Sequence, residues 1–171
     1  MNKKVVIAAL VLMCSIATVA LGEWTIYPIV DPMTSQVTFQ AKSSTTYPTT
    51  KMDFPYGDIK AWLIIQYDGV DELAAILFST SPNLTNTTTN NGYYIITARV
   101  KFDDTIEEVK LYQEWLDKYL IFVDSDRVIQ RMKTSKTMLV ELSWFSQGKV
   151  YFNFDLTGVS DVIDTMHSKY K

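Results

Sequence analysis

Apolar and polar residues alternate along the segment Gly92 to Phe102. The polar phase carries mainly threonine, arginine and lysine. A period of two is typical of a β-strand that buries one face. The segment therefore predicts a long central strand of an antiparallel sheet. Its apolar phase consists of Tyr94, Ile96, Ala98, Val100 and Phe102.

A tight turn at Asp103-Asp104 predicts a hairpin between this strand and a second one over Ile106 to Trp115. If the two aspartates form the loop, Ile96 lies opposite Leu111 on the buried face. Arg99 then lies opposite Glu108 on the other face, and we expect these two side chains to form a cross-strand ion pair.

The same alternation, with turn residues between the segments, predicts further strands. The first two should pair as a hairpin, and the third is nearly all apolar, as expected for a strand covered on both faces. The additional strands are Trp24 to Val30, Gln36 to Lys42, Ile59 to Tyr67, Leu73 to Phe78, Tyr119 to Val123, Lys136 to Phe145 and Val150 to Asp155.

Two segments have helical spacing instead. Acidic residues from Asp124 to Asp126 precede an apolar stripe and predict a short internal helix. A second stripe, from Val159 to Tyr170, predicts a C-terminal helix capped by Thr157 or Ser160. The expected fold is mainly β, an antiparallel β-sandwich with one short internal helix and a C-terminal helix.

Two polar segments, residues 43–58 and 79–91, are expected to be long loops. The first carries the aromatic residues Tyr47, Phe54 and Tyr56. Exposed aromatic side chains are enriched where proteins bind, but loop aromatics also cap the core of small β domains. Both interpretations stay open at this point.

The N-terminus predicts export. Lys3 and Lys4 precede an apolar stretch and the small residues Ala20-Leu21-Gly22, the pattern of a cleaved secretory signal peptide over residues 1–22. One alternative is a retained membrane anchor, but Ser15 and Thr18 interrupt its apolar stretch. The other is a lipoprotein modified at Cys14, but Met13 is a poor fit to the small residue expected before a lipidated cysteine. We therefore expect one domain over residues 23–171, in the periplasm or secreted, with no stable membrane span.

Cleavage changes the chemistry of the chain. It removes Cys14, the only cysteine, so the mature chain has neither disulfide nor thiol. The formal charge falls from −3 to −5, because Lys3 and Lys4 leave and no acid does. This acidic balance argues against a nucleic-acid partner.

Candidate catalytic residues are few. His167 is the only histidine and lies near the C-terminus, where a helix-end role is expected; the sequence carries no recognisable nucleophile, phosphate or zinc motif. We expect no enzyme, no catalytic residue, no cofactor and no metal site. The alternative, a hydrolase using carboxylates, requires that two acids converge in one pocket. The candidates are Asp53, Asp58, Asp68 and Asp155.

The order of short motifs resembles a family of small exported bacterial proteins, the type VI secretion-associated periplasmic proteins. The motifs are Asp31-Pro32-Met33-Thr34, Arg99-Val100-Lys101-Phe102-Asp103 and Phe154-Asp155-Leu156-Thr157-Gly158, with Trp24 before the first and a short helix between the last two. The resemblance implies a β-sandwich-like domain without a cofactor. Members often carry two cysteines, and the corresponding places here hold Gln66-Tyr67 and His167-Ser168.

The sequence thus predicts a non-enzymatic accessory protein that binds a protein partner in the cell envelope. It assigns no oligomeric state. An inhibitor or immunity-type protein, acting on a cell-wall hydrolase or excluding phage, is the alternative, since an acidic surface suits docking to a basic enzyme. The expected partner contacts are Tyr47, Phe54, Tyr56, Arg99 and Lys101.

Overall fold

The computed structural model describes residues 19–21 and 24–170. Its strands form one antiparallel sheet in the order β1-β2-β3-β4-β5-β9-β8-β7-β10-β11, with β6 paired to β7. The strands are β1 (Val19–Leu21), β2 (Trp24–Val30), β3 (Val37–Lys42), β4 (Ala61–Tyr67), β5 (Glu72–Phe78), β6 (Thr87–Asn90), β7 (Tyr93–Phe102), β8 (Thr105–Gln113), β9 (Tyr119–Phe122), β10 (Thr137–Trp144) and β11 (Gly148–Asp155).

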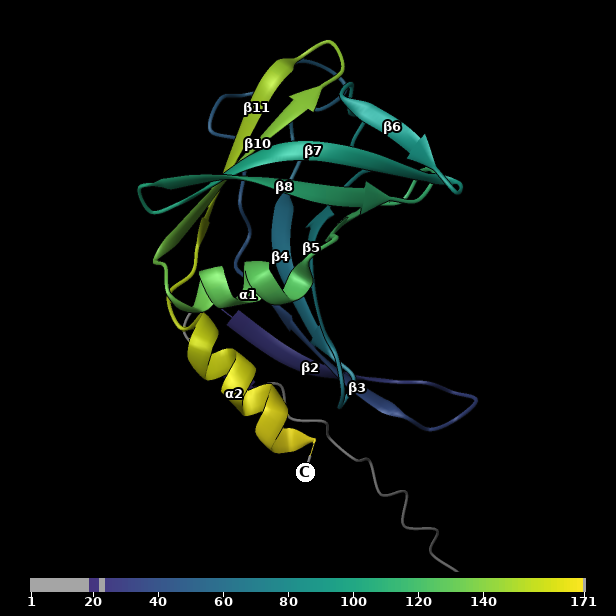
Figure 1. Cartoon of the computed structure of the whole chain (residues 1–171), viewed down its shortest axis with the longest axis vertical. Helices are drawn as coiled ribbons and strands as arrows, with labels where there is room; N and C mark the ends of the chain where they lie inside the picture. Colours follow the sequence, from purple (N-terminus) through teal and green to yellow (C-terminus); the bar gives the residue numbers. More distant parts are fainter. Residues whose placement is uncertain (1–18, 22–23, 171) are drawn as a thin grey trace, which may run out of the picture.

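The predicted fold class is confirmed: the protein is mainly antiparallel β, with the internal helix α1 (Ser125–Lys133) and the C-terminal helix α2 (Val159–Lys169). The layers of the expected sandwich belong to one continuous sheet that bends strongly (Figure 1). Both helices lie in front of the sheet in this view, and α1 contacts β5 and β9 while α2 contacts β2, β3 and β4.

The central hairpin follows the predicted register throughout. Ile96 lies opposite Leu111, and Arg99 lies opposite Glu108. Strand β7 is central in the sheet, because β8 pairs with one edge while β10 and β6 share the other. Its apolar phase is buried from Ile96 to Phe102, so the period of two identified the core face correctly.

The two predicted loops are more regular than expected. Residues 79–91 contain strand β6, which pairs with the first half of β7. In residues 43–58, Thr46 bridges to Ala61 and Pro48 bridges to Phe152. This segment therefore connects β4 with β11, two strands that are far apart in the sheet order.

Helix caps follow the prediction in one case only. Asp124 is the N-cap of α1 and its side chain accepts a hydrogen bond from the Arg127 backbone amide. The expected cap of α2 by Thr157 or Ser160 is wrong, because Gly158 occupies the N-cap with a φ of 83° and makes no side-chain hydrogen bond there. A left-handed residue at this position favours glycine.

The predicted signal peptide lies mostly outside the described residues. Cleavage after Gly22 would remove β1, which pairs with β2 from Trp24 to Ile26. Among residues 19–21 and 24–170, no helix has the length and apolar character needed to cross a membrane.

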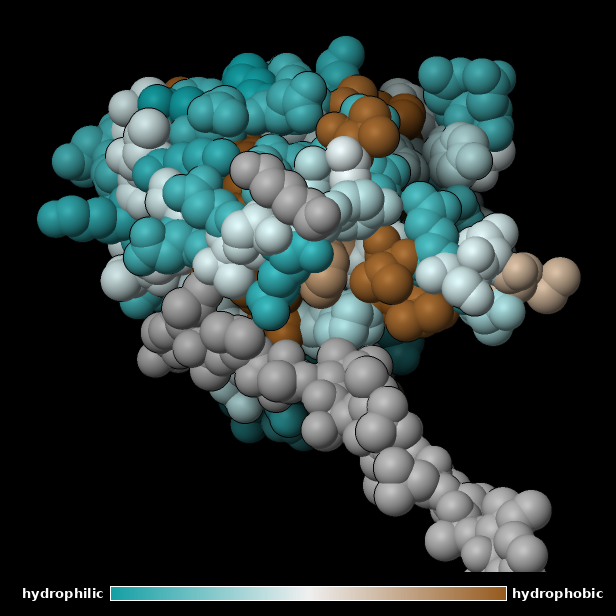
Figure 2. All heavy atoms as spheres, turned by 90° about the horizontal axis from the view of Figure 1, so that it is seen from below, coloured by the Kyte–Doolittle hydropathy of each residue, from teal (hydrophilic) through white to brown (hydrophobic). Residues whose placement is uncertain are grey.

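Figure 2 views the protein from the end that carries the β2–β3 hairpin and shows a largely hydrophilic surface with separate apolar patches. The hairpin contributes three exposed apolar side chains, Ile29, Val30 and Met33.

Candidate functional site

One face of the sheet carries large apolar side chains that the helices do not cover. In β4 and β5, Leu63 and Ile76 point into the core cluster, which also contains the buried side chains of both helices. The alternate positions point to the opposite face. Ile64 and Ala75 in this phase are buried, whereas five larger side chains are partly exposed. We call these five the aromatic sheet face: Trp62, Leu73, Leu77, Tyr119 and Ile121.

The register places these side chains in rows across the strands. Leu77 lies opposite Tyr119 on one side and Trp62 on the other. A second, longer row crosses six strands and begins at Ile95; in order it contains Ile95, Tyr112, Ile121, Ala75, Ile64 and Lys42. Directly opposed side chains contact one another, so the rows form a continuous surface.

This surface is densely filled. Ile64 is only 1 % exposed although it lies outside the core cluster, so the surrounding long side chains cover it. The Lys42 ammonium lies 4.0 Å from the centre of the Trp62 ring. The pKa of Tyr27, on β2, is raised mainly by burial and to a smaller extent by the charge of Tyr119, on β9. Three strands separate β2 from β9 in the sheet. The sheet itself bends around the opposite, core face, where Phe78 of β5 contacts Trp144 of β10 and Phe152 of β11.

An acidic hollow of about 440 Å³ adjoins the aromatic sheet face. Leu73, Ile121 and Tyr112 line it, so its apolar wall is part of the same surface. Five carboxylates also line the hollow, from the β4–β5 turn on one side and from the start of α1 on the other: Asp68, Asp71, Glu72, Asp124 and Asp126.

The β4–β5 side of the hollow is an aspartate-stabilised turn. The Asp68 carboxylate accepts hydrogen bonds from the backbone amides of Val70, at 2.9 Å, and Asp71, at 2.8 Å. The amides of Asp71 and Val70 lower the pKa of Asp68, so this carboxylate stays ionised. Glu72 differs from the others because its Oε1 lies 2.7 Å from His167 Nε2 on α2.

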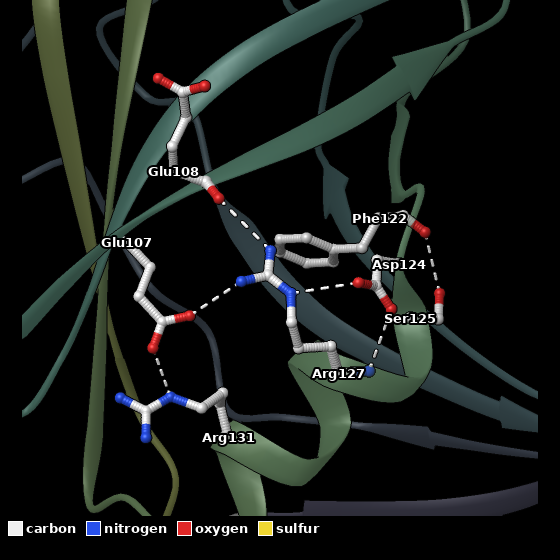
Figure 3. Close-up of polar contacts among 7 residues, drawn as sticks. All are labelled: Glu107, Glu108, Phe122, Asp124, Ser125, Arg127 and Arg131. Carbon is white, nitrogen blue, oxygen red and sulfur yellow. Dashed lines mark hydrogen bonds and ion pairs between the residues drawn. The ribbon is translucent and has the colours of Figure 1, made fainter.

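The α1 side is fixed by a polar network (Figure 3). Ser125 Oγ donates to the Phe122 carbonyl at 2.9 Å and accepts from the Ala74 amide at 3.0 Å, which joins β9, β5 and the first turn of α1. Arg127 Nε donates to Asp124 at 3.1 Å. The two acidic segments are thus held on either side of Leu73.

Glu107 anchors the helix to β8 (Figure 3). Its Oε2 lies 3.1 Å from Arg127 Nη1, and its Oε1 lies 2.5 Å from Arg131 Nε. Arg127 also donates to the backbone carbonyl of Glu108 at 3.3 Å. One carboxylate therefore holds two guanidinium groups on successive turns of α1.

The expected loop contacts differ in their exposure. Tyr47 is exposed, and Phe54 is 94 % exposed. Tyr56 instead packs edge-on against Trp144, with ring centres 5.3 Å apart. Thus Tyr56 caps the core, whereas Tyr47 and Phe54 keep the exposure that a contact residue needs.

Arg99 and Lys101 share the outward face of β7, but both have intramolecular partners. Lys101 lies 3.6 Å from Asp104. The expected cross-strand pairing of Arg99 with Glu108 is confirmed. The ion pair of Arg99, however, is a two-point contact with Glu141 of β10, which lies opposite it on the other side. Glu141 also accepts from Tyr151 and contacts Lys149, which makes it the better partner.

This cluster predicts an acid-dependent loss of stability. The pKa of Glu141 is lowered from 4.5 to about 2, above all by its hydrogen bond with Arg99. Hydrogen bonds from Tyr151 and Lys149 lower it further. The carboxylate therefore stabilises the fold above pH 4.5, and this contribution is lost as the pH falls toward 2. Because Arg99 and Lys149 are more than half exposed, solvent screens these ion pairs. We therefore expect the ionised Glu141 to contribute about 1–2 kcal/mol to the free energy of unfolding.

The measurement is denaturant unfolding between pH 2 and 7 for the wild type and Glu141→Gln. The variant should be less stable at pH 7, and the difference should shrink below pH 4.5. Glu108→Gln, on the neighbouring strand, is the matched control. A difference between Glu141→Gln and wild type that stays constant over the whole range would contradict the prediction.

The acids considered for catalysis are mostly separated. Asp53 and Asp58 line one hollow of about 640 Å³, both from the same exposed loop, whereas Asp68 lines the acidic hollow. Asp155 accepts from the Thr157 amide near the start of α2. Within the described part of the chain, no group of histidine, cysteine and acidic side chains could hold a metal ion.

The residues that sequence reasoning missed are those of the aromatic sheet face. Ile59 to Tyr67 was interpreted as a strand covered on both faces, because it is nearly all apolar. Its outward positions are instead not covered by a helix: Trp62 is partly exposed, contacts Lys42 and donates a hydrogen bond to Thr45 of the 43–58 segment. The sequence does carry a signal for this face: β4, β5 and β9 each have apolar residues in both of their alternating phases.

No protein-family model matches the chain, and neither a similar curated protein nor a similar solved structure was found.

Proposed function

We propose that this protein is a non-enzymatic, exported protein that binds another protein of the cell envelope. The observation that carries the proposal is the aromatic sheet face, on which five large apolar side chains of neighbouring strands are partly exposed. Contiguous exposed apolar surface on a folded domain favours a binding role. The signal-peptide pattern of residues 1–22 supports export, and the resemblance to type VI secretion-associated periplasmic proteins supports an accessory role.

The acidic hollow specifies the chemistry of the partner. Its carboxylates lie beside Leu73 and Ile121, so a complementary surface has apolar side chains at its centre and lysine or arginine at one edge. The exposed acids Asp71 and Asp126 are available for such pairs. We therefore propose a partner with a basic contact surface.

Leu73→Ser should lower the affinity for the partner at least tenfold, because it removes an apolar contact at the junction of the sheet face and the hollow. The tagged mature chain is incubated with envelope extract, and proteins retained by the wild type but lost with Leu73→Ser are identified by mass spectrometry. Their affinities are then measured with purified components. Ile106→Ser, an exposed apolar residue at the far end of β8, is the control.

The edge charges are tested with Asp71→Asn combined with Asp126→Asn. Binding should weaken at low salt, and the difference from wild type should shrink as salt is raised. Asp104→Asn combined with Glu108→Gln, both exposed on the β7–β8 hairpin and outside the acidic hollow, removes the same number of charges and controls for net charge. If Phe54→Ser abolishes binding while Leu73→Ser does not, the interface lies on the loops and the assignment to the sheet face is wrong.

The acidic hollow also favours a second candidate function, inhibition of a basic cell-wall hydrolase. An acidic rim beside an apolar wall can bind a cationic enzyme and block its substrate. The test is muramidase activity with added mature protein over a range of salt concentrations. Undiminished activity throughout that range would exclude this version.

A further inference from the structure

A second hollow, of about 470 Å³, lies at the end of the sheet where β8 ends and the segment after β5 passes. It is independent of the aromatic sheet face, and the two share no residue. Three aromatic rings line it, together with small polar and aliphatic side chains. The lining is Tyr56, Ser81, Pro82, Asn83, Leu84, Thr87, Tyr94, Gln113, Trp115 and Leu116.

The aromatic rings are supported from behind. Tyr56 packs against the buried Trp144, and Tyr94 packs against Trp115 with ring centres 5.8 Å apart. Both tyrosines pack against the core cluster. Trp115 is nevertheless 70 % exposed. The hollow therefore combines fixed tyrosine rings with a tryptophan that can be covered by a ligand.

A buried amide fixes the two walls. Gln113 is only 5 % exposed, and its Nε2 donates to the carbonyls of Pro82, at 3.1 Å, and Asp117, at 2.9 Å. These carbonyls belong to the segment after β5 and the segment after β8. Gln113 thus holds the wall that carries Asn83 and the wall that carries Trp115 in one arrangement.

The Trp115 wall also holds a strained residue. Leu116 has a φ of 61°, in the left-handed region that branched side chains rarely adopt, and its side chain is 70 % exposed. Such strain costs about 1–2 kcal/mol and persists where the surrounding structure enforces it. An exposed apolar side chain held in this way at the edge of a hollow is available to a ligand.

We propose that this hollow binds a neutral oligosaccharide. Among the described residues that line it, none carries a charge. Ser81, Asn83 and Thr87 provide hydroxyl and amide groups, which can both donate and accept hydrogen bonds as sugar hydroxyls do. The apolar C–H face of a pyranose ring can stack on an aromatic ring such as Trp115. A hollow of this size accommodates two or three sugar rings.

The test follows the indole N–H signals of the four tryptophans, Trp24, Trp62, Trp115 and Trp144, in protein labelled with ¹⁵N-tryptophan. Triacetylchitotriose and maltotriose are titrated separately. The Trp115 signal should shift and saturate with at least one of them, at a dissociation constant on the order of 1 mM. The signal of the buried Trp24 should stay in place.

Trp115→Ala should abolish saturable binding of the sugar. Phe145→Ala, which removes a similarly exposed aromatic ring that does not line the hollow, should leave binding unchanged. Gln113→Leu should weaken binding at least tenfold, because both walls lose their shared donor. Two results overturn the proposal: no shift with either sugar up to about 10 mM, or a Trp115 shift with a proline-rich peptide and with neither sugar.

Discussion

Gly69→Ala should lower the free energy of unfolding by about 2–4 kcal/mol. Gly69 has a φ of 99°, which an alanine adopts only with strain. A Cβ atom there would lie 2.0 Å from Cε1 of the Tyr170 ring, so the ring would have to move. That ring packs edge-on against Phe39 and Tyr67, and its displacement would separate the end of α2 from the sheet. Unfolding in guanidinium chloride, followed by circular dichroism, measures the loss.

Gly92→Ala is the matched control for this prediction. Gly92 also has a positive φ, of 87°, but nothing lies within 4 Å of the added Cβ, so only the backbone strain of about 1 kcal/mol applies. A second comparison uses protein that already carries Tyr170→Ala and therefore lacks the ring. In that protein, Gly69→Ala should lower the free energy of unfolding by no more than Gly92→Ala does. Equal losses for the two glycines in the wild-type background would contradict the steric argument.

Local pattern was sufficient to predict the central hairpin. In β7 and β8 the buried phase, the two-residue turn and the register follow from residues within about 20 positions of one another, and the structure agrees. The same reasoning predicted the β2–β3 hairpin and the start of α1 within residues 124–126. Period, turn residues and caps are local properties, so they can be read from adjacent residues.

Pairings between distant segments could not be predicted in this way. The hairpin register gives Arg99 one neighbour, Glu108, but Arg99 has a second neighbour across β10, and Glu141 is 42 residues away in sequence. Nor does any local pattern show that Pro48 bridges to Phe152 of β11. These contacts depend on the strand order of the whole sheet.

The candidate site was missed for the same reason. The acids at Asp68 and Asp71 and those at Asp124 and Asp126 look like an ordinary turn and an ordinary helix start. They become one hollow because β5 pairs with β9, which brings the β4–β5 turn to the start of α1. The amphipathic pattern of α1 predicts its buried side, but not which strand its arginines contact.

The arginines of α1 give the second large effect. Glu107→Gln should lower the free energy of unfolding by about 1–3 kcal/mol. Glu107 is 21 % exposed and holds both Arg127 and Arg131, so its neutral amide would leave two guanidinium groups without their shared counter-charge (Figure 3). Arg131 also lies over the Phe102 ring, 5.4 Å from its centre, and cannot turn to water without losing that contact.

The adjacent residue provides the control for this prediction. Glu108 points to the opposite, exposed side of β8 and contributes only its backbone carbonyl to the network, so Glu108→Gln should change stability by less than about 0.5 kcal/mol. Hydrogen exchange of the α1 amides should accelerate in Glu107→Gln alone, because the helix loses its anchor to β8. Because Asp124 and Asp126 move with that helix, affinity for a basic partner should fall in the same variant. Equal exchange rates in the two variants would show that packing of Val128, Ile129 and Met132, rather than Glu107, holds α1 beside the acidic hollow.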